Sequence, residues 1–203
     1  MFDKEVRVLY KNHFNKIETA ELHKVHADYI QRISVFDKDK PSEVLGLLQE
    51  NLVSFNKCIP IIENLKNPSL RVRHWSQLKE QITNMKFLSP ANADFNFELL
   101  YRSELIANDV RIRETSSKAN HEKQIEDGLE AIKNEWMTVK LHYEEKISKD
   151  QILEEVFERH KLLLAKYKIS GYQEFFMTEI EMWERKITNI IDTFEFLLSV
   201  QKS

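Results

Sequence analysis

Residues 67–75 read Asn-Pro-Ser-Leu-Arg-Val-Arg-His-Trp, and this stretch decides how the helical patterns on either side of it are joined. Pro68 cannot continue an upstream helix, because it lacks a backbone donor and clashes with the preceding turn. Ser69 is suited to accept a backbone N–H as the N-cap of the next helix. That helix presents an apolar stripe at steps of four and three residues: Arg71, Trp75, Leu78, Ile82 and Met85.

His74 and Trp75 fit ordinary core and boundary positions of this helix, since His74 shares a row with Leu70 and Leu78 beside the tryptophan. We interpret the whole stretch as a corner that clamps two helical layers together. Nothing in it indicates a site of chemistry.

The composition favours an all-α protein. Only three glycines and four prolines interrupt 203 residues, and a β-protein of this length needs many more turn residues. The length suits one substantial domain or two small ones. We therefore predict an elongated bundle of long antiparallel helices without a sheet of consequence.

Charge and hydropathy exclude several classes of protein. The formal net charge is −3, and acidic and basic residues alternate along the chain, which argues against a nucleic-acid-binding face. No apolar run approaches the roughly 18 residues of a membrane span. The charged start predicts no secretory signal, and the single cysteine, Cys58, is expected to pack as a small apolar residue. The sequence indicates a cytosolic protein.

Upstream of the corner, two apolar stripes predict a long first helix bent near residues 19–21. They are Phe2, Val6, Leu9, Tyr10, Phe14 and Ile17, and then Leu22, Val25, Tyr29, Ile33 and Phe36. The polar run 37–41 predicts a loop, and Ser42 an N-cap. The second helix should bury Val44, Leu48, Leu52, Phe55, Ile59 and Ile62, and Pro60 should kink it or end it one turn early.

Downstream of the corner, residues 87–97 predict a loop whose phenylalanines and leucine are tucked against helices. Residues 98–145 then predict the longest helix. Its polar part, residues 113–124, is expected to bridge through solvent or to pack on something outside this chain. Its second half is periodic at Ile125, Leu129, Ile132, Trp136, Val139 and Tyr143.

Two further helices complete the pattern. Ser148 and Gln151 fit a capping box for a shorter helix that ends near Ser170-Gly171. The last helix has an apolar stripe that is typical of bundle packing, widened by Phe175, Ile191 and Leu198: Tyr172, Phe176, Ile180, Trp183, Ile187, Ile190, Phe194, Leu197 and Gln201. The end at Lys202-Ser203 carries no cap or breaker, so we expect a longer parent polypeptide.

No residue set predicts catalysis, a cofactor or a metal. His23 and His26 have a metal-compatible spacing but no third ligand is placed to complete the set. Cys58 has no histidine near it in sequence, and a phosphate-binding loop needs several glycines in a short window. The alternating charges of residues 122–126 predict a solvated helix surface.

The corner closely resembles the N-P-x-L-R-x-R-H-W signature of dynein heavy chains, just inside the linker region. The matching residues are Asn67, Pro68, Leu70, Arg71, Arg73, His74 and Trp75. Upstream, residues 59–65 resemble the proline-containing apolar run that precedes the signature. Downstream, the family's spacing of apolar, acidic and tryptophan positions is matched by Ala119, Glu122, Ile125, Glu126, Leu129, Ile132 and Trp136, and then by Tyr172, Phe175, Ile180 and Trp183.

This resemblance covers roughly residues 42–203, and two features depart from it. Ile187 replaces the family's usual leucine, and the glycine-containing hairpin often found after the long helix is absent between Tyr143 and Asp150. Gln201 would stand just before the family's tryptophan–tyrosine–leucine–glutamate continuation. The implied division is a helix at the tail–linker junction, residues 1–40, followed by the first part of the linker bundle, residues 41–203.

The resemblance implies a mechanical role. The linker is a helical lever that couples ATP-driven changes in the AAA+ ring to movement along microtubules, and this chain would be its tail-proximal part, without catalysis of its own. The implied partners are the AAA+ ring, the remaining linker and the tail. Intermediate chains, light chains and microtubules would be reached only through the full-length motor. The implied location is the cytoplasm and cytoskeleton, or the axoneme of a cilium or flagellum.

A static helical scaffold that binds partner helices is the alternative from another class of protein. Spectrin-like repeats would recur at a fixed period, and none relates the segments around Trp75, Trp136 and Trp183. An enzyme is disfavoured because the sequence lacks site chemistry.

Overall fold

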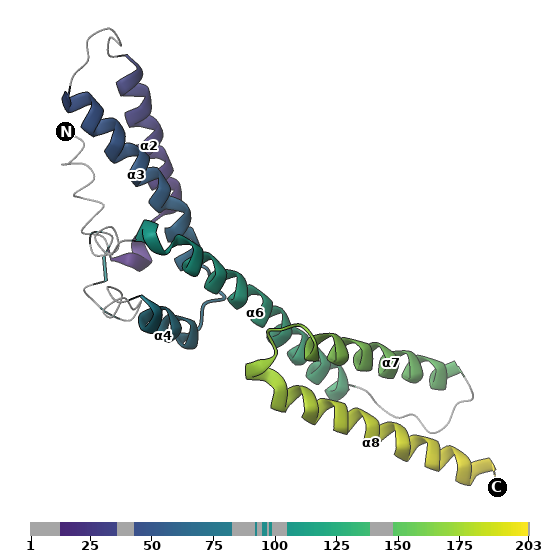
Figure 1. The fold of residues 1–203 in the computed structure, drawn as a ribbon. Helices are drawn as coiled ribbons and strands as arrows, with labels where there is room; N and C mark the ends of the chain where they lie inside the picture. Colours follow the sequence, from purple (N-terminus) through teal and green to yellow (C-terminus); the bar gives the residue numbers. More distant parts are fainter. Residues whose placement is uncertain are drawn as a thin grey trace. The chain divides into compact units, whose positions relative to one another are not determined.

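The computed structural model describes residues 13–35, 43–82, 92, 95, 96, 98, 105–138 and 148–202, and these residues are helical almost throughout (Figure 1). The elements in order are η1 (Phe14–Lys16), α2 (Thr19–Ser34), α3 (Glu43–Leu65), α4 (Val72–Gln81), η3 (Leu105–Asn108), α6 (Asp109–Thr138), α7 (Ser148–Lys168), η4 (Glu174–Phe176) and α8 (Met177–Lys202). Within the described ranges the only β-type pairing is an isolated bridge between His13 and Asn96. The all-α prediction is confirmed.

The chain divides into two compact units, residues 1–119 and residues 120–203. Helix α6 begins in the first unit and ends in the second. Each unit has its own apolar core.

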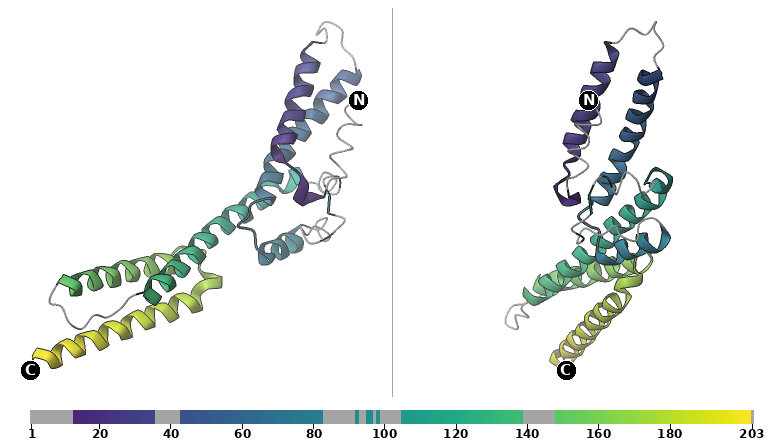
Figure 2. Two further views of the ribbon diagram at one scale, coloured as in Figure 1. Left: turned by 180° about the vertical axis from the view of Figure 1, so that it is seen from behind. Right: turned by 90° about the vertical axis from the view of Figure 1, so that its left-hand side faces the viewer.

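In the first unit, α2 and α3 lie side by side, as the views in Figures 1 and 2 agree. The predicted inner face of α3 is buried at Leu52, Phe55, Ile59 and Ile62, and Leu48 is half-buried. The prediction is wrong for Val44, which is exposed. Val44 lies in the first turn of α3.

The expected single helix through residues 14–34 is wrong. A 3₁₀ turn at Phe14–Lys16 is followed by extended backbone at Ile17 and Glu18, and α2 starts only at Thr19. Phe14 and Ile17 are both buried, and the Phe14 N–H donates to the Phe95 carbonyl oxygen at 2.8 Å. Lys66 also donates to the Ile17 carbonyl oxygen. These long-range contacts hold the chain out of helical geometry just before the predicted bend.

Pro60 does not end α3 early, since the helix continues to Leu65. The proline lies on the exposed side of the helix, where water can hydrogen-bond the carbonyl oxygen that has lost its backbone donor. The Asn64 side chain donates to the Pro60 carbonyl oxygen at 2.8 Å and so satisfies one acceptor in the last turn.

The second unit contains the end of α6 together with α7, η4 and α8, and α7 runs antiparallel to α8 (Figure 2). Its core includes Ile125, Leu129 and Ile132 of α6, as predicted, and Ile180 and Ile187 of α8. Helix α7 ends at Lys168, and Gly171 adopts φ +81°, which glycine tolerates without a Cβ penalty. The predicted stop near residues 170–171 is confirmed.

The final helix starts later and has a narrower buried stripe than predicted. Tyr172 precedes a 3₁₀ turn, and α8 begins at Met177. Phe176, Ile180, Trp183 and Ile187 are buried, but Phe175 and Leu197 are exposed. Phe175 faces solvent because it lies one residue from Phe176, which occupies the core position of the same turn.

Some predictions fall on residues that the structure does not describe. They are the stripe before Phe14, Phe36, the loop at 37–41, the Ser42 cap, Met85, most of the loop at 87–97, and residues 139–147. The side chains of the proposed Ser148–Gln151 capping box and of Leu198 and Gln201 also lie outside the described residues.

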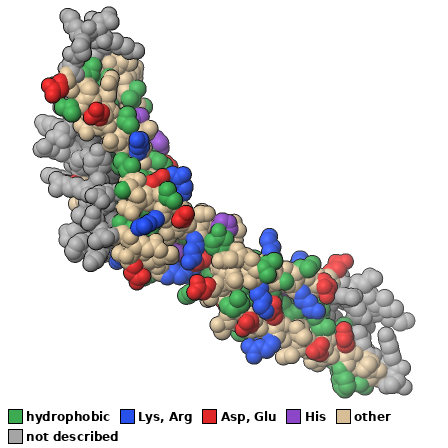
Figure 3. All heavy atoms as spheres, viewed as in Figure 1, with side chains coloured by type: hydrophobic (Ala, Val, Ile, Leu, Met, Phe, Trp, Pro, Cys, Tyr) green, Lys and Arg blue, Asp and Glu red, His purple; other side chains and the backbone are tan. Residues whose placement is uncertain are grey.

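The surface carries both signs of charge. On the face drawn in Figure 3, lysine and arginine lie among aspartate and glutamate over the described residues. None of the described helices is both long enough and apolar enough to cross a bilayer.

Candidate functional site

The corner is held by the side chain of Asn67. Its Oδ1 accepts the backbone N–H of Ser69 at 2.9 Å, which closes a turn around Pro68. Its Nδ2 donates to the carbonyl oxygen and to Oγ of Ser116 on α6, at 3.1 and 2.9 Å. One amide therefore fixes the local turn and attaches that turn to α6.

One face of the polar part of α6 is buried within the chain, and for that face the predicted solvent-bridging or externally packed segment is wrong, whereas positions such as Glu114 and Gln124 are exposed. Thr115, Ser116, Ala119 and Glu122 are buried, and they lie at helical spacing between the buried residues Ile112 and Ile125. The small side chain of Ser116 lets Asn67 of the corner reach the α6 backbone and donate to the Ser116 carbonyl oxygen. The predicted solvated surface at residues 122–126 is likewise wrong for Glu122, which is buried.

Helix α4 begins differently from the prediction. Ser69 is not its N-cap, because the helix starts at Val72 and Arg71 holds the extended backbone before it. The backbone N–H of Arg71 donates to Nδ1 of His74 at 2.9 Å, so the buried imidazole closes the first turn from inside. His74 is only 1% exposed. Sequence reasoning missed this role because it placed the N-cap at Ser69, and His74 stands three residues after the actual N-cap, Arg71.

Trp75 is the centre of an aromatic cluster in the first unit. It is 8% exposed, and its ring meets those of Phe14 and Phe95 edge-on, each at 6.0 Å and 84°. Phe14 and Phe95 lie 4.5 Å apart. The prediction of a tucked-in apolar loop is confirmed at Phe95, which is fully buried.

The remaining residues of the corner signature are less buried than His74 and Trp75. Pro68 is exposed, Leu70 is partly buried against the core, and Arg71 and Arg73 are partly exposed. The structure thus brings the signature together as one corner, with Asn67, Leu70, His74 and Trp75 making inward contacts.

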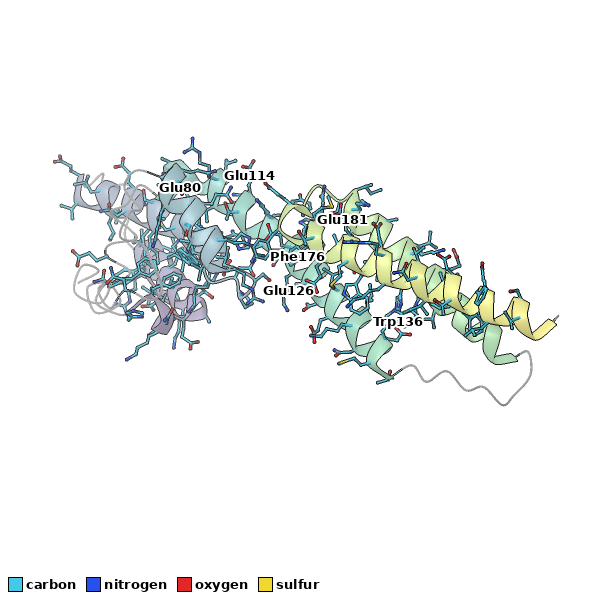
Figure 4. The ribbon with its side chains drawn as sticks, turned by 90° about the horizontal axis from the view of Figure 1, so that it is seen from below. Glu80, Glu114, Glu126, Trp136, Phe176 and Glu181 are labelled. Atoms are coloured by element: carbon cyan, nitrogen blue, oxygen red, sulfur yellow. The ribbon has the colours of Figure 1, made fainter. Side chains whose placement is uncertain are left out.

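In the second unit, Trp136 joins α6 to α7 (Figure 4). Its Nε1–H donates to Nδ1 of His160 at 3.1 Å, and its ring stacks on Phe157 with the centroids 5.2 Å apart. His160 Nε2 lies 3.1 Å from Oε2 of Glu135, and Arg159 donates to the other oxygen of that carboxylate. Burial lowers the pKa of His160 from its ordinary value of 6.5, opposed by Glu135.

The other signature residues of this unit have separate surroundings. Trp183 is 7% exposed, and its indole N–H has no hydrogen-bond partner among the described residues, while Lys186 Nζ lies 4.9 Å from the ring centroid. Tyr172 stacks on His121 at 4.4 Å. Sequence reasoning missed His121, for which the pattern gave no signal.

Gly128 is a further residue that sequence reasoning passed over. A Cβ placed there would lie 1.8 Å from the hydroxyl oxygen of Tyr167 and 2.6 Å from its Cζ. Gly128 therefore leaves the space on α6 that the Tyr167 side chain of α7 occupies.

The residues that we considered for metal and thiol chemistry, His23 and Cys58, have surroundings that favour neither role. His23 contacts Glu63 at 3.2 Å, and both side chains are exposed. The described residues contain no group of three or more histidine, cysteine, aspartate or glutamate side chains that would hold a metal. Cys58 is buried, and burial raises its pKa to about 11, which disfavours the reactive thiolate.

Comparison with known proteins identifies the family. The family model "Dynein heavy chain, N-terminal region 2" matches residues 1–203. The chain is 28% identical over 180 residues to dynein axonemal heavy chain 2 of Mus musculus, which covers 85% of this chain. It is 29% identical over 196 residues to the dynein-1-beta heavy chain of the flagellar inner arm I1 complex of Chlamydomonas reinhardtii, which covers 94% of this chain. A cytoplasmic dynein heavy chain of Fusarium vanettenii is 26% identical over 161 residues, or 76% of this chain.

In each case the chain spans only 4% of the relative's length. The match over all 203 residues extends to the N-terminal part, which the sequence motifs had left less diagnostic. The chain belongs to the dynein heavy chain family and corresponds to its N-terminal region 2.

Proposed function

We propose that this chain is the tail-proximal part of a dynein linker, the lever that couples ATP-driven changes in the AAA+ ring to movement along microtubules. Family membership and the signature corner support this role. In this proposal residues 1–40 form the tail–linker junction and residues 41–203 the first part of the linker bundle. The chain carries force and performs no catalysis itself.

The observation that carries the proposal is the attachment of the corner to α6 through Asn67. A lever must hold its bends rigid, since a loose bend dissipates displacement. Asn67 fixes the turn after α3 and makes two hydrogen bonds to Ser116. Helix α6 then continues without interruption to Thr138, in the second unit.

The partners of the proposed lever are the rest of a dynein heavy chain, namely the AAA+ ring, the remaining linker and the tail. Intermediate chains, light chains and microtubules would be engaged only through that full-length motor. The relatives include axonemal and flagellar heavy chains as well as a cytoplasmic one. We accordingly assign the parent motor to the cytoskeleton, in a cilium or flagellum or in the cytoplasm.

The test is Asn67→Ala in a full-length heavy chain that carries this region, with Asn56→Ala as the matched control. Asn56 is an exposed asparagine on α3 of the same unit. We expect Asn67→Ala to slow microtubule gliding while microtubule-stimulated ATPase activity is retained, because the corner yields under load. The control should glide at the normal speed. Normal gliding by Asn67→Ala would contradict the lever proposal.

A static scaffold that binds a partner helix is the second candidate, and one observation favours it. Phe196, Leu197 and Val200 are exposed on the last turns of α8, as at surfaces that receive another helix. Two measurements separate the candidates, namely the gliding speed of Asn67→Ala and the recruitment of a partner by Phe196→Ser. If Phe196→Ser abolished partner recruitment while Asn67→Ala left gliding speed unchanged, the scaffold would be favoured over the lever.

A further inference from the structure

A directional chain of hydrogen bonds joins α6 to α7 in the second unit. The indole N–H of Trp136 can only donate, and it points at Nδ1 of His160 over 3.1 Å. The carboxylate of Glu135 can only accept when ionised, and its Oε2 lies 3.1 Å from Nε2 of the same ring. Both contacts are satisfied together by one form of His160, the neutral ring with its proton on Nε2.

The surroundings of His160 favour this neutral form. The residue is 3% exposed, so a positive charge there would lose most of its hydration. Among the described residues, the nearby charges are Glu135 on α6, which stabilises the protonated ring, and Arg159 on α7, which opposes it. On α8, the antiparallel pairing seen at Lys168–Glu184 brings Asp192 to the level of His160, and Asp192 is exposed.

We propose that Glu135, Trp136 and His160 form a proton-sensitive latch between α6 and α7, closed when His160 is neutral and opened when it is protonated. Protonation places a hydrogen on Nδ1, where it faces the indole hydrogen of Trp136. Two donors then point at each other with no acceptor between them, so the indole and the imidazole must separate. The contact with Glu135 survives, and the opening is therefore confined to the Trp136 side.

The direction of the pH effect follows from burial. The pKa of His160 lies below its ordinary value of 6.5 in the folded chain. The unfolded chain therefore binds more protons than the folded chain just below pH 6.5. The stabilisation from the latch is fully present above that value, and it is lost as the pH falls towards the folded pKa.

The first test uses the unaltered chain, labelled with ¹⁵N and titrated from about pH 8 to about pH 5. At the upper end we expect the His160 ring to show the Nε2–H tautomer. The Trp136 indole resonance, assigned by its loss in Trp136→Phe, should shift with the same midpoint as the His160 ring, below pH 6.5. A ring protonated on Nδ1 at pH 8 would overturn the proposal. So would a Trp136 indole resonance whose chemical shift does not change as His160 titrates.

The second test uses His160→Gln. The glutamine side chain can accept from the indole and donate to Glu135 at every pH, so the latch should stay closed and the pH response of the Trp136 indole should disappear. His23→Gln is the matched control, because His23 is an exposed histidine that contacts a glutamate in the first unit. The control should keep the full response of Trp136. An unchanged response in His160→Gln would assign the titration to another group and end the latch proposal.

Discussion

The aromatic corner of the first unit and the tryptophan bundle of the second are built in different ways. The corner collects Phe14, Trp75 and Phe95 from three distant segments, and a backbone hydrogen bond joins two of them. The bundle is made from the end of α6 together with α7 and α8, each contributing an apolar stripe. The aromatic corner depends on contacts between short segments that are far apart in sequence. The tryptophan bundle depends on the periodic apolar residues of three long helices.

The three tryptophans show what this difference means for energetics. Trp75 meets two aromatic rings within the largely aliphatic core of the first unit. Trp136 uses its N–H to join two helices, whereas the buried N–H of Trp183 has no partner among the described residues. Trp75 and Trp183 are buried to the same degree and Trp136 is partly buried, so the cost of substitution should follow the contacts of each ring as well as its burial, and the following experiments test that ranking.

Trp75→Ala should have the largest effect. Removing a nearly fully buried indole leaves a cavity beside the Phe14–Phe95 pair, and we expect the free energy of unfolding to fall by about 3–5 kcal/mol. Denaturant unfolding followed by circular dichroism measures the loss. Trp75→Phe, which keeps an aromatic ring in the cluster, should lose clearly less. A melting temperature of Trp75→Ala equal to that of the unaltered chain would refute the clamp.

Gly128→Ala should destabilise the second unit by about 1–3 kcal/mol, because the new methyl group overlaps the Tyr167 side chain. Gly46→Ala is the matched control in the first unit. Gly46 also lies inside a helix, but nothing is within 4 Å of its added Cβ, so alanine should stabilise by about 0.5–1 kcal/mol. Thermal unfolding measures both. The same sign for the two substitutions would show that the close α6–α7 approach is wrong.

Asn67→Ala should cost about 1–3 kcal/mol, since it removes two hydrogen bonds to Ser116 and one from Ser69. Asn67→Asp separates these roles, because a carboxylate can still accept from Ser69 but cannot donate to Ser116. We expect Asp to recover part of the stability lost in Ala, as measured by urea unfolding. Equal losses for Asp and Ala would mean that the turn gains nothing from the Ser69 bond.

The smallest expected effect is the difference in unfolding free energy between Trp136→Phe and Trp183→Phe, two substitutions in the second unit. Trp136→Phe leaves Nδ1 of buried His160 without its donor, which we expect to cost about 1 kcal/mol more than Trp183→Phe. Trp183→Phe removes an N–H that has no partner among the described residues. Urea midpoints compare the two variants. A larger loss for Trp183→Phe would indicate that its N–H is bonded in the folded chain.

The sequence was sufficient where a pattern is local and repeated. Low glycine and proline content predicted the all-α class, and spacing predicted the buried positions Leu129, Ile132, Ile180 and Ile187. The signature residues 67–75 predicted both the corner and the family. These inferences succeed because helical periodicity and backbone restrictions act within a few residues of the chain.

Tertiary structure alone decided the inward contacts. The break after Phe14, the capping role of His74 and the burial of Thr115, Ser116 and Glu122 depend on partners far away in sequence or on the exact start of a helix. Only the folded chain places Asn67 against Ser116, His160 against Trp136 and Tyr167 against Gly128. A polar side chain can be buried where a partner satisfies its hydrogen bonds. The spacing of apolar residues in the sequence does not show which distant residue will be that partner.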